Sequence, residues 1–223
     1  MRKESKIKTR RISGSTIRRL SMYHRTLDIL DHGGVETISS QKLADIEDIT
    51  SAQVRKDLSF FGSFGRRGLG YNVSLLKKSI AHILGLNKRW NIVLIGAGHL
   101  GNALMNYEEF KKKNFYITKI FDKSRKMVGK EIKDIPINHI NDLEEMLDAK
   151  TDNLAILAIP PQDVQSIIDR LSKIGIRGVL YFASRTVSVP KNMVIRNEDT
   201  SIELETLTYH ITNKTDRPVK AFS

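Results

Sequence analysis

The sequence of 223 residues contains no cysteine. This absence excludes disulfide scaffolds, thiolate metal sites and cysteine nucleophiles. Long apolar runs are also missing, since none approaches the roughly 20 residues that span a bilayer. The first residues, MRKESKIKTRR, offer no apolar stretch for a signal peptide. We therefore expect a soluble, cytoplasmic protein with no membrane partner.

Positive charge is concentrated near the N-terminus. Residues 1–90 hold 18 Lys and Arg against 8 Asp and Glu, whereas residues 91–223 hold 19 against 17. Nearly all of the formal net charge of +12 therefore lies in the first two fifths of the chain. An excess confined to one segment is typical of a polyanion-binding module joined to a near-neutral one. A basic surface that only aids solubility is the alternative interpretation.

The apolar pattern changes near the same place. Helical spacing from about 16 to 61 gives way, after 91, to short apolar runs that alternate with amphipathic stretches. This order predicts a helical or winged head and an α/β body, with the boundary near 87–90.

The head contains three predicted helices before a glycine-rich segment. The first spans 16–32, the second starts at Ser39-Ser40, and the third starts near 51. Thr50 and Gln53 have capping-box spacing and can satisfy each other's free backbone donors. Apolar residues occupy one side of the third helix, and small, basic and polar residues occupy the other: Val54, Leu58 and Phe61 against Ala52, Arg55, Lys56 and Ser59.

This arrangement matches a helix-turn-helix whose third helix reads DNA. The following GSFGRRGLGYNV predicts a β-hairpin with a basic tip, which would be the wing of a winged helix. Arginines at such a tip suit phosphates or a narrow minor groove. The predicted contacts with double-stranded DNA are Ser51, Arg55, Lys56, Ser59, Arg66, Arg67, Gly68 and Tyr71. An ordinary surface helix with two basic residues is the alternative.

The body opens with a glycine-rich motif. NIVLIGAGHLG at 91–101 is an apolar, β-rich run followed by GxGxxG, and a second run, YITKIFD, ends at Asp122. Strand, glycine loop, helix and an acid about 20 residues further on are typical of a dinucleotide site. The carboxylate repels a 2′-phosphate and favours NAD(H), although Lys123 and Arg125 leave NADP(H) open. The predicted loop and ribose contacts are Gly96, Ala97, Gly98, His99, Leu100, Gly101 and Asp122.

Further apolar runs at 135–140, 153–160, 178–183 and 193–197 complete a predicted doubly wound parallel sheet. Pro160 and Phe182 lie at carboxyl ends of strands and are candidate contacts on the nicotinamide side. A helix-starting proline and a core phenylalanine are the alternatives. The six histidines form no HxH or HExxH arrangement, so no metal site is predicted. With no catalytic residues and no room for a substrate domain, we predict a protein that binds its cofactor without turning it over and is not an enzyme.

A winged helix, a Rossmann domain and one terminal helix together resemble the Rex family of redox-sensing transcriptional repressors, over about residues 15–213. The segments that carry the resemblance are RRLSMYHR (18–25), SAQVRKDLSFFGSFGRRGLGYNV (51–73), IGAGHLGNALMNY (95–107), FD (121–122), GIRGVLYFA (175–183) and EDTSIELETLTY (198–209).

The resemblance implies a homodimer that binds NADH or NAD+, with its C-terminal helix swapped into the partner beside the winged head. It implies that Tyr107 lies near the nicotinamide and that Arg19 and Asp199 form a switching pair. The last segment has Leu204, Leu207 and Ile211 on one face, which has to pack on something. A helix folded back on its own domain is the alternative to a swap.

The predicted organisation has five parts. These are a basic arm (1–14), a winged-helix DNA-binding domain (15–88), a Rossmann NAD(H)-binding domain (89–198), a C-terminal helix (199–213) and a polar tail (214–223). The predicted function is a repressor that binds operator DNA when NADH is scarce and is released by NADH. Its rivals are a small NAD-dependent dehydrogenase with a basic appendage and a structural nucleic-acid-binding protein with a vestigial Rossmann fold. Without a thiol, redox sensing would have to act through the bound nucleotide.

Overall fold

The computed structural model describes residues 12–66 and 68–213. Most of the predicted basic arm, Arg67 and the polar tail lie outside these residues. The chain divides into two compact units between Asn87 and Lys88. We call residues 12–87 the head and residues 88–213 the body.

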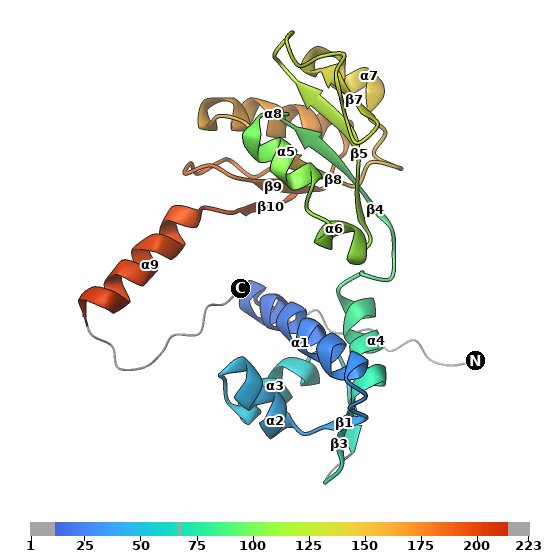
Figure 1. The fold of residues 1–223 in the computed structure, drawn as a ribbon, viewed down its shortest axis with the longest axis vertical. Helices are drawn as coiled ribbons and strands as arrows, with labels where there is room; N and C mark the ends of the chain where they lie inside the picture. The colour runs from blue at the N-terminus through green and yellow to red at the C-terminus, as the bar shows by residue number, and fades with distance from the viewer. Residues whose placement is uncertain (1–11, 67, 214–223) are drawn as a thin grey trace. The chain divides into compact units, whose positions relative to one another are not determined.

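The head packs its helices against a small antiparallel sheet (Figure 1). Its elements are α1 (Gly14–His32), β1 (Thr37–Ile38), α2 (Ser40–Glu47), α3 (Ser51–Ser59), β2 (Gly65–Arg66), β3 (Gly70–Asn72) and α4 (Val73–Ile83). All four helices begin at a side chain that accepts a backbone N–H of the first turn. Their apolar faces meet in one core that includes Leu20, Leu43, Val54 and Leu76.

The start of α3 differs from the predicted capping box. The Thr50 hydroxyl accepts the N–H of Gln53 at 3.1 Å, as predicted. The Gln53 side chain does not return to Thr50, however, and instead donates to the carboxylate of Asp57 at 2.7 Å. The cap is therefore one-sided, because a buried carboxylate one turn further on takes the amide.

The body is an α/β sandwich with a mainly parallel sheet. Its elements are β4 (Trp90–Ile95), α5 (His99–Met105), α6 (Glu109–Lys112), β5 (Phe115–Asp122), β6 (Glu131–Ile132), β7 (Ile135–His139), η1 (Ile140–Asp142), α7 (Leu143–Met146), β8 (Leu154–Leu157), α8 (Pro161–Ile174), β9 (Gly178–Tyr181), β10 (Val194–Asn197) and α9 (Thr200–Thr212). Across the described residues the strand order is β10-β9-β8-β4-β5-β7-β6. The six parallel strands thus run 6-5-4-1-2-3 in chain order, which is the doubly wound Rossmann arrangement.

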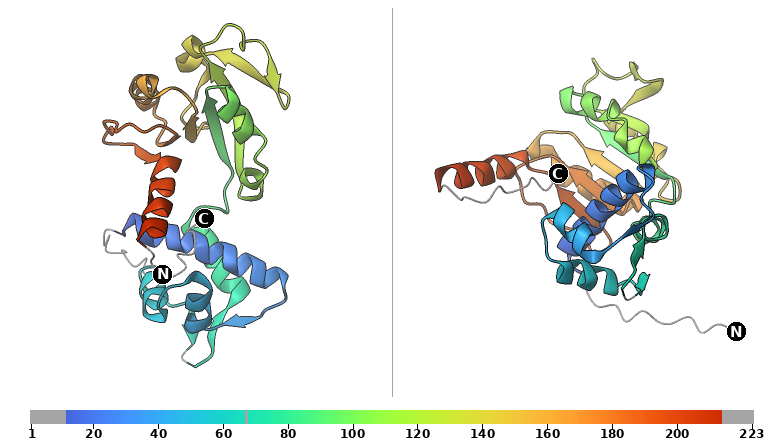
Figure 2. Two further views of the ribbon diagram at one scale, coloured as in Figure 1. Left: turned by 60° about the vertical axis from the view of Figure 1, so that its left-hand side comes forward. Right: turned by 60° about the horizontal axis from the view of Figure 1, so that its bottom comes forward.

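Alternate residues of β4 face opposite sides of the sheet. Val93 and Ile95 pack with α7 and α8, whereas Ile92 and Leu94 pack with α5. In the left view of Figure 2, the green helix α5 and the brown-orange helix α8 lie on opposite sides of the sheet. The parallel strands are therefore covered on both sides, which explains why their sequences read as continuous apolar runs.

Several short elements carry no clear sequence signal. The two-residue strands β1 and β6 were not predicted, and the helix predicted to continue through residues 103–113 is divided into α5, which ends at Met105, and α6. The last helix, α9, was predicted, but it buries none of its residues. Leu204, Leu207 and Ile211 on its apolar face are 62%, 57% and 77% exposed. Among the described residues, no helix combines the length and apolarity that a bilayer span needs.

Candidate functional site

The head presents one polar, basic face of α3 to solvent. Arg55, Lys56 and Ser59 are exposed on this helix, and Ser51 at its start is partly exposed. The Ser59 hydroxyl donates to the carbonyl of Lys56 at 2.7 Å. Arg55 Nη1 donates to the hydroxyl of Ser40, at the start of α2, over 3.1 Å. The predicted DNA-contacting side chains of α3 therefore share one accessible surface, and Ser40 joins them although sequence reasoning did not select it.

The predicted hairpin lies beside that surface. β2 and β3 pair antiparallel, with Gly65 opposite Tyr71 and Arg66 opposite Gly70. A hollow of about 460 Å³ is lined by residues from the start of α2, from α3 and from the hairpin. Gly68 at the turn is exposed. These positions support a wing next to a recognition helix.

Arg67 and Tyr71 differ from the other predicted hairpin contacts. Arg67 lies outside the described residues. Tyr71 is only 9% exposed and belongs to the core of the head. Its ring fits there because residue 65 is glycine, where an added Cβ would lie 2.9 Å from the ring. Tyr71 thus anchors the hairpin to the core, and a direct contact with DNA stays a prediction.

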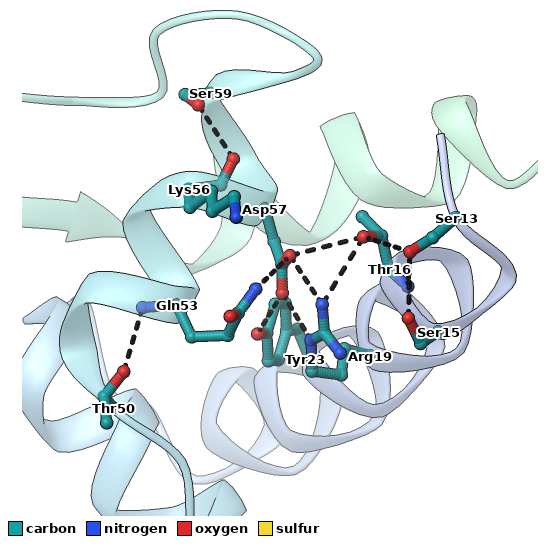
Figure 3. Close-up of polar contacts among 10 residues, drawn as sticks. All are labelled: Ser13, Ser15, Thr16, Arg19, Tyr23, Thr50, Gln53, Lys56, Asp57 and Ser59. Atoms are coloured by element: carbon teal, nitrogen blue, oxygen red, sulfur yellow. Dashed lines mark hydrogen bonds and ion pairs between the residues drawn. The ribbon is translucent and has the colours of Figure 1, made fainter. Parts of the chain in front are cut away.

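The predicted switch residues have local partners in their own units. Arg19 of α1 pairs with Asp57 of α3, with 2.6 Å between Nε and Oδ2 (Figure 3). Asp199 caps α9 by accepting the backbone N–H and the hydroxyl of Ser201 at 3.0 and 2.6 Å. Hydrogen bonds from Ser201 and Ser184 lower the pKa of Asp199 below its ordinary value. Pairing of Arg19 with Asp199 stays a prediction.

In the body, the glycine loop joins β4 to α5 at the carboxyl end of the sheet. An added Cβ at Gly96 would lie 2.2 Å from the carbonyl oxygen of Ala158, and one at Gly101 would lie 1.9 Å from that of Gly96. Both positions therefore need glycine for close packing of the loop. No side chain caps the first turn of α5, which starts after Gly98. Its backbone N–H groups are suitably placed for an anionic ligand.

The Asp122 carboxylate, at the end of β5, holds this loop. Oδ2 accepts the backbone N–H of Ala97 at 2.7 Å, and Oδ1 accepts that of Ser124 at 2.7 Å. The first contact links the acid to the glycine loop across the tops of two neighbouring strands. Asp122 therefore has a structural role that the sequence spacing did not reveal.

A cleft of about 360 Å³ opens beside the loop, within the size range of small-ligand sites. The predicted residues that line it are Gly96, Gly98, Asp122 and Pro160. The loop, the acid and the residue after β8 are thus brought together at one edge of the sheet, where ligands of doubly wound folds bind.

Two ion pairs flank this cleft, and the sequence did not predict either. Lys123 pairs with Asp163 of α8 at 2.6 Å. Arg170 pairs with Glu144 and also donates to the carbonyl of Ile140 at 2.8 Å. The hydrogen bond from Arg170 lowers the pKa of Glu144 to about 2. Because Lys123 is already paired, its charge offers weaker support for a 2′-phosphate than the sequence suggested.

The remaining predicted contacts lie elsewhere in the body. His99 and Leu100 are exposed in the first turn of α5. Tyr107 is 54% exposed and makes an edge-on contact with Phe110, with 5.1 Å between ring centroids. Phe182 packs against the apolar cluster on the α5 side of the sheet. Neither aromatic residue lines the cleft beside the glycine loop, so both stay predictions for the nicotinamide side.

A winged-helix head joined to a Rossmann body defines the class: a DNA-binding protein with its own nucleotide-binding domain. Comparisons with known proteins agree with this class. The model described as "Putative DNA-binding protein N-terminus" matches residues 11–59, and the model "CoA binding domain" matches residues 87–185.

Curated relatives and solved structures cover almost the whole chain. The redox-sensing transcriptional repressor Rex of Carboxydothermus hydrogenoformans is 42% identical over 90% of this chain and 97% of its own length. The Rex of Desulforamulus reducens is 40% identical over 93% and 99%. A Rex-family repressor, RSP, solved with β-NAD+ and operator DNA, is 36% identical with a TM-score of 0.86, over 91% of this chain and 94% of RSP. Its complex with β-NADH gives 34% identity and a TM-score of 0.83, over 91% and 95%. The chain belongs to the Rex family of redox-sensing transcriptional repressors and is not an enzyme.

Proposed function

We propose that this chain represses transcription by binding operator DNA through its head, and that NADH in the body releases it. The observation that carries the proposal is that one chain holds both an exposed basic recognition face and a glycine loop at the carboxyl end of a parallel sheet. Relatives solved with NAD+ and operator DNA, and with NADH, support it. We also propose that the protein works in the cytoplasm, where chromosomal DNA and NADH are both present.

On the DNA side, α3 enters the major groove and the hairpin lies along the backbone. Arg55 and Lys56 are suited to guanine edges or phosphates, and Ser59 to a neighbouring acceptor. Ser51 and Gly68 contact the backbone near the two ends of this surface, together with Arg66, Arg67 and Tyr71. Ser40 would help to orient Arg55, because their side chains already share a hydrogen bond.

On the nucleotide side, the pyrophosphate lies against the loop from Gly96 to Gly101, and the ribose lies near Asp122. The paired state of Lys123 and the carboxylate at 122 both favour NAD(H) over NADP(H). His99 borders the pyrophosphate, and Tyr107, Pro160 and Phe182 lie toward the nicotinamide. The protein supplies only binding and orientation here, as a sensor requires.

We propose a homodimer in which α9 packs on the partner subunit. The exposed apolar face of α9 supports this proposal, because an isolated apolar helix face of this kind is typical of an interface. Arg19 of one subunit and Asp199 of the other would form the switching pair. Sedimentation of the full chain checks the proposal: a dimer is expected, and a monomer at micromolar concentration would contradict it.

The switch depends on the difference between the affinities of NADH for the DNA-competent and the DNA-incompetent states, rather than on a high affinity for NADH. To lower DNA binding by two orders of magnitude, NADH has to prefer the DNA-incompetent state by about 2.7 kcal/mol.

Replacing Arg55 with alanine tests the recognition face. We expect Arg55→Ala to weaken operator binding by about 1–3 kcal/mol, because a base-reading arginine is lost, while NADH affinity is unchanged. Fluorescence anisotropy of labelled duplexes, with NADH titrated separately, measures both. Lys78→Ala is the matched control, because it removes an exposed cation of α4. Equal operator affinities of Arg55→Ala and Lys78→Ala would exclude the assigned face.

A further inference from the structure

The recognition helix carries a charge on its buried side. Asp57 is 0% exposed and lies one turn after Val54, on the face of α3 that packs into the head. Its neighbours Arg55, Lys56 and Ser59 point away from the core and are exposed. A buried carboxylate is strongly unfavourable unless it is paired and fully hydrogen-bonded. Its presence in so small a core therefore calls for a specific role.

Both oxygens of this carboxylate are occupied (Figure 3). Oδ1 accepts from Arg19 Nη2 at 2.8 Å and from Gln53 Nε2 at 2.7 Å. Oδ2 accepts from Arg19 Nε at 2.6 Å and from the Tyr23 hydroxyl at 2.9 Å. Burial raises the pKa of Asp57, but the hydrogen bonds from Arg19, Tyr23 and Gln53 outweigh it and keep the pKa below its ordinary value. The group is thus a carboxylate at neutral pH.

These contacts tie α3 to α1 in a directional way. Arg19 and Tyr23 lie one turn apart on α1, and the guanidinium meets the carboxylate with two parallel N–H donors. Such a fork restricts orientation as well as distance. The apolar contacts of α3 are not directional in this sense, because hydrophobic burial depends on area rather than angle. The carboxylate cluster therefore adds a directional restraint on the rotation of α3 about its own axis to the apolar packing of Val54 and Leu58.

A small rotation of α3 is enough to misplace its reading side chains. A side chain that extends about 6 Å from the helix axis moves by about 2 Å when the helix turns by about 20°. Hydrogen bonds to base edges tolerate only a few tenths of an ångström. Contacts with phosphates are more tolerant, since they depend mainly on charge.

We propose that Asp57 is a positioning residue for DNA recognition, which fixes the rotation of α3 against α1 and so directs Arg55, Lys56 and Ser59 toward the bases. Asp57 does not itself touch DNA. The inference rests on the proposed function, and it predicts that Asp57 controls sequence discrimination rather than general affinity for DNA.

Asp57→Asn in the full-length chain tests this role. Asparagine keeps the size and one acceptor but loses the charge and the fork with Arg19. An operator duplex is first selected from random sequences with the wild-type chain, and its affinity is compared with that of an unrelated duplex over a series of salt concentrations. Asp45→Asn is the matched control, because it makes the same charge change at an exposed site on α2, where the carboxylate accepts a hydrogen bond from Gln41 one turn earlier.

We expect operator affinity to fall about tenfold or more relative to Asp45→Asn, as when base contacts are lost. Non-specific affinity and the slope of log K against log salt should match those of the control. Tyr23→Phe removes one donor at nearly constant volume and should cause a smaller loss in the same direction. A merely structural role would lower both affinities in proportion to the folded fraction, which far-UV circular dichroism measures.

The outcomes are distinct. An operator preference in folded Asp57→Asn equal to that of Asp45→Asn overturns the inference. If Asp57→Asn does not fold, Tyr23→Phe decides, and an unchanged preference in that variant overturns the inference as well. If Arg55→Ala also leaves the operator preference unchanged, the proposed recognition surface itself is wrong, and not only the role of Asp57.

Discussion

Arg19→Ala is expected to destabilise the head by about 3–5 kcal/mol at pH 7, because it leaves the buried Asp57 carboxylate without its cation. This is a large fraction of the stability of a small domain. The same substitution of an exposed cation, Lys78→Ala, should cost less than about 0.5 kcal/mol. The difference reflects the zero exposure of Asp57 rather than the general loss of a positive charge.

The effect of Arg19→Ala should depend on pH in a defined direction. In the wild type, the lowered pKa of Asp57 means that its pairing stabilises the fold above about pH 4 and that this contribution is lost as the pH falls through the folded pKa. Without Arg19, burial raises the pKa of Asp57 above its ordinary value. The unpaired carboxylate then destabilises the folded head fully above this raised pKa, and the destabilisation disappears as the pH falls to the ordinary pKa. The stability difference between the two proteins should therefore narrow as the pH falls toward 4, and it should close only below the lowered pKa of wild-type Asp57.

Urea unfolding followed by two probes measures this prediction. The single tryptophan, Trp90, lies at the start of β4 and reports on the body, whereas far-UV circular dichroism also follows the helical head. We expect Arg19→Ala to shift the dichroism transition of the head and to leave the Trp90 transition in place. A loss below 1 kcal/mol at pH 7, or a loss that stays constant to pH 4, would show that the carboxylate does not depend on Arg19.

Gly98→Ala should separate sensing from DNA binding. Gly98 has an extended backbone, φ −71° and ψ −163°, and among the described residues no atom beyond its own chain neighbours lies within 4 Å of an added Cβ. The variant should therefore fold as well as the wild type. Gly98 lines the cleft, however, and the second glycine of this motif lets the backbone approach the pyrophosphate. A methyl group there should lower NADH affinity by about tenfold or more and leave a repressor that NADH no longer releases.

Thermal denaturation with and without NADH tests Gly98→Ala. At 100 times its dissociation constant, a ligand stabilises the folded state by about 2.7 kcal/mol, so wild-type protein should show a clear rise in melting temperature. The variant should have the same melting temperature as the wild type without NADH and a much smaller rise with it. An undiminished rise would remove Gly98 from the nucleotide site. Gly101→Ala is the contrasting variant, because its Cβ would collide with the backbone and should lower stability even without ligand.

The sequence predicted the features that depend on local pattern. The spacing of Thr50 and Gln53 located the start of α3, and the glycine motif with Asp122 located the loop at the top of the sheet. These signals lie within short windows, where capping, periodicity and close backbone contacts act.

The features that escaped prediction join distant parts of the chain. Asp57 reads as one more surface acid of an amphipathic helix, and only the packing of α1 against α3 brings Arg19 to it from 38 positions away. Lys123 and Asp163 likewise meet across 40 positions. Because no single-sequence periodicity encodes which charges pair across a core or a cleft, these residues became visible only in the folded structure.

A titration of operator DNA with the wild-type chain at one stated salt concentration tests the central claim most directly. The duplex is titrated without nucleotide, with NAD+ and with NADH, since affinities for DNA have meaning only at known salt. We expect tight binding without nucleotide and with NAD+, and binding weakened by about two orders of magnitude with NADH. Equal operator affinity in all three conditions would contradict the claim, and would point instead to a DNA-binding protein whose nucleotide domain does not control the head.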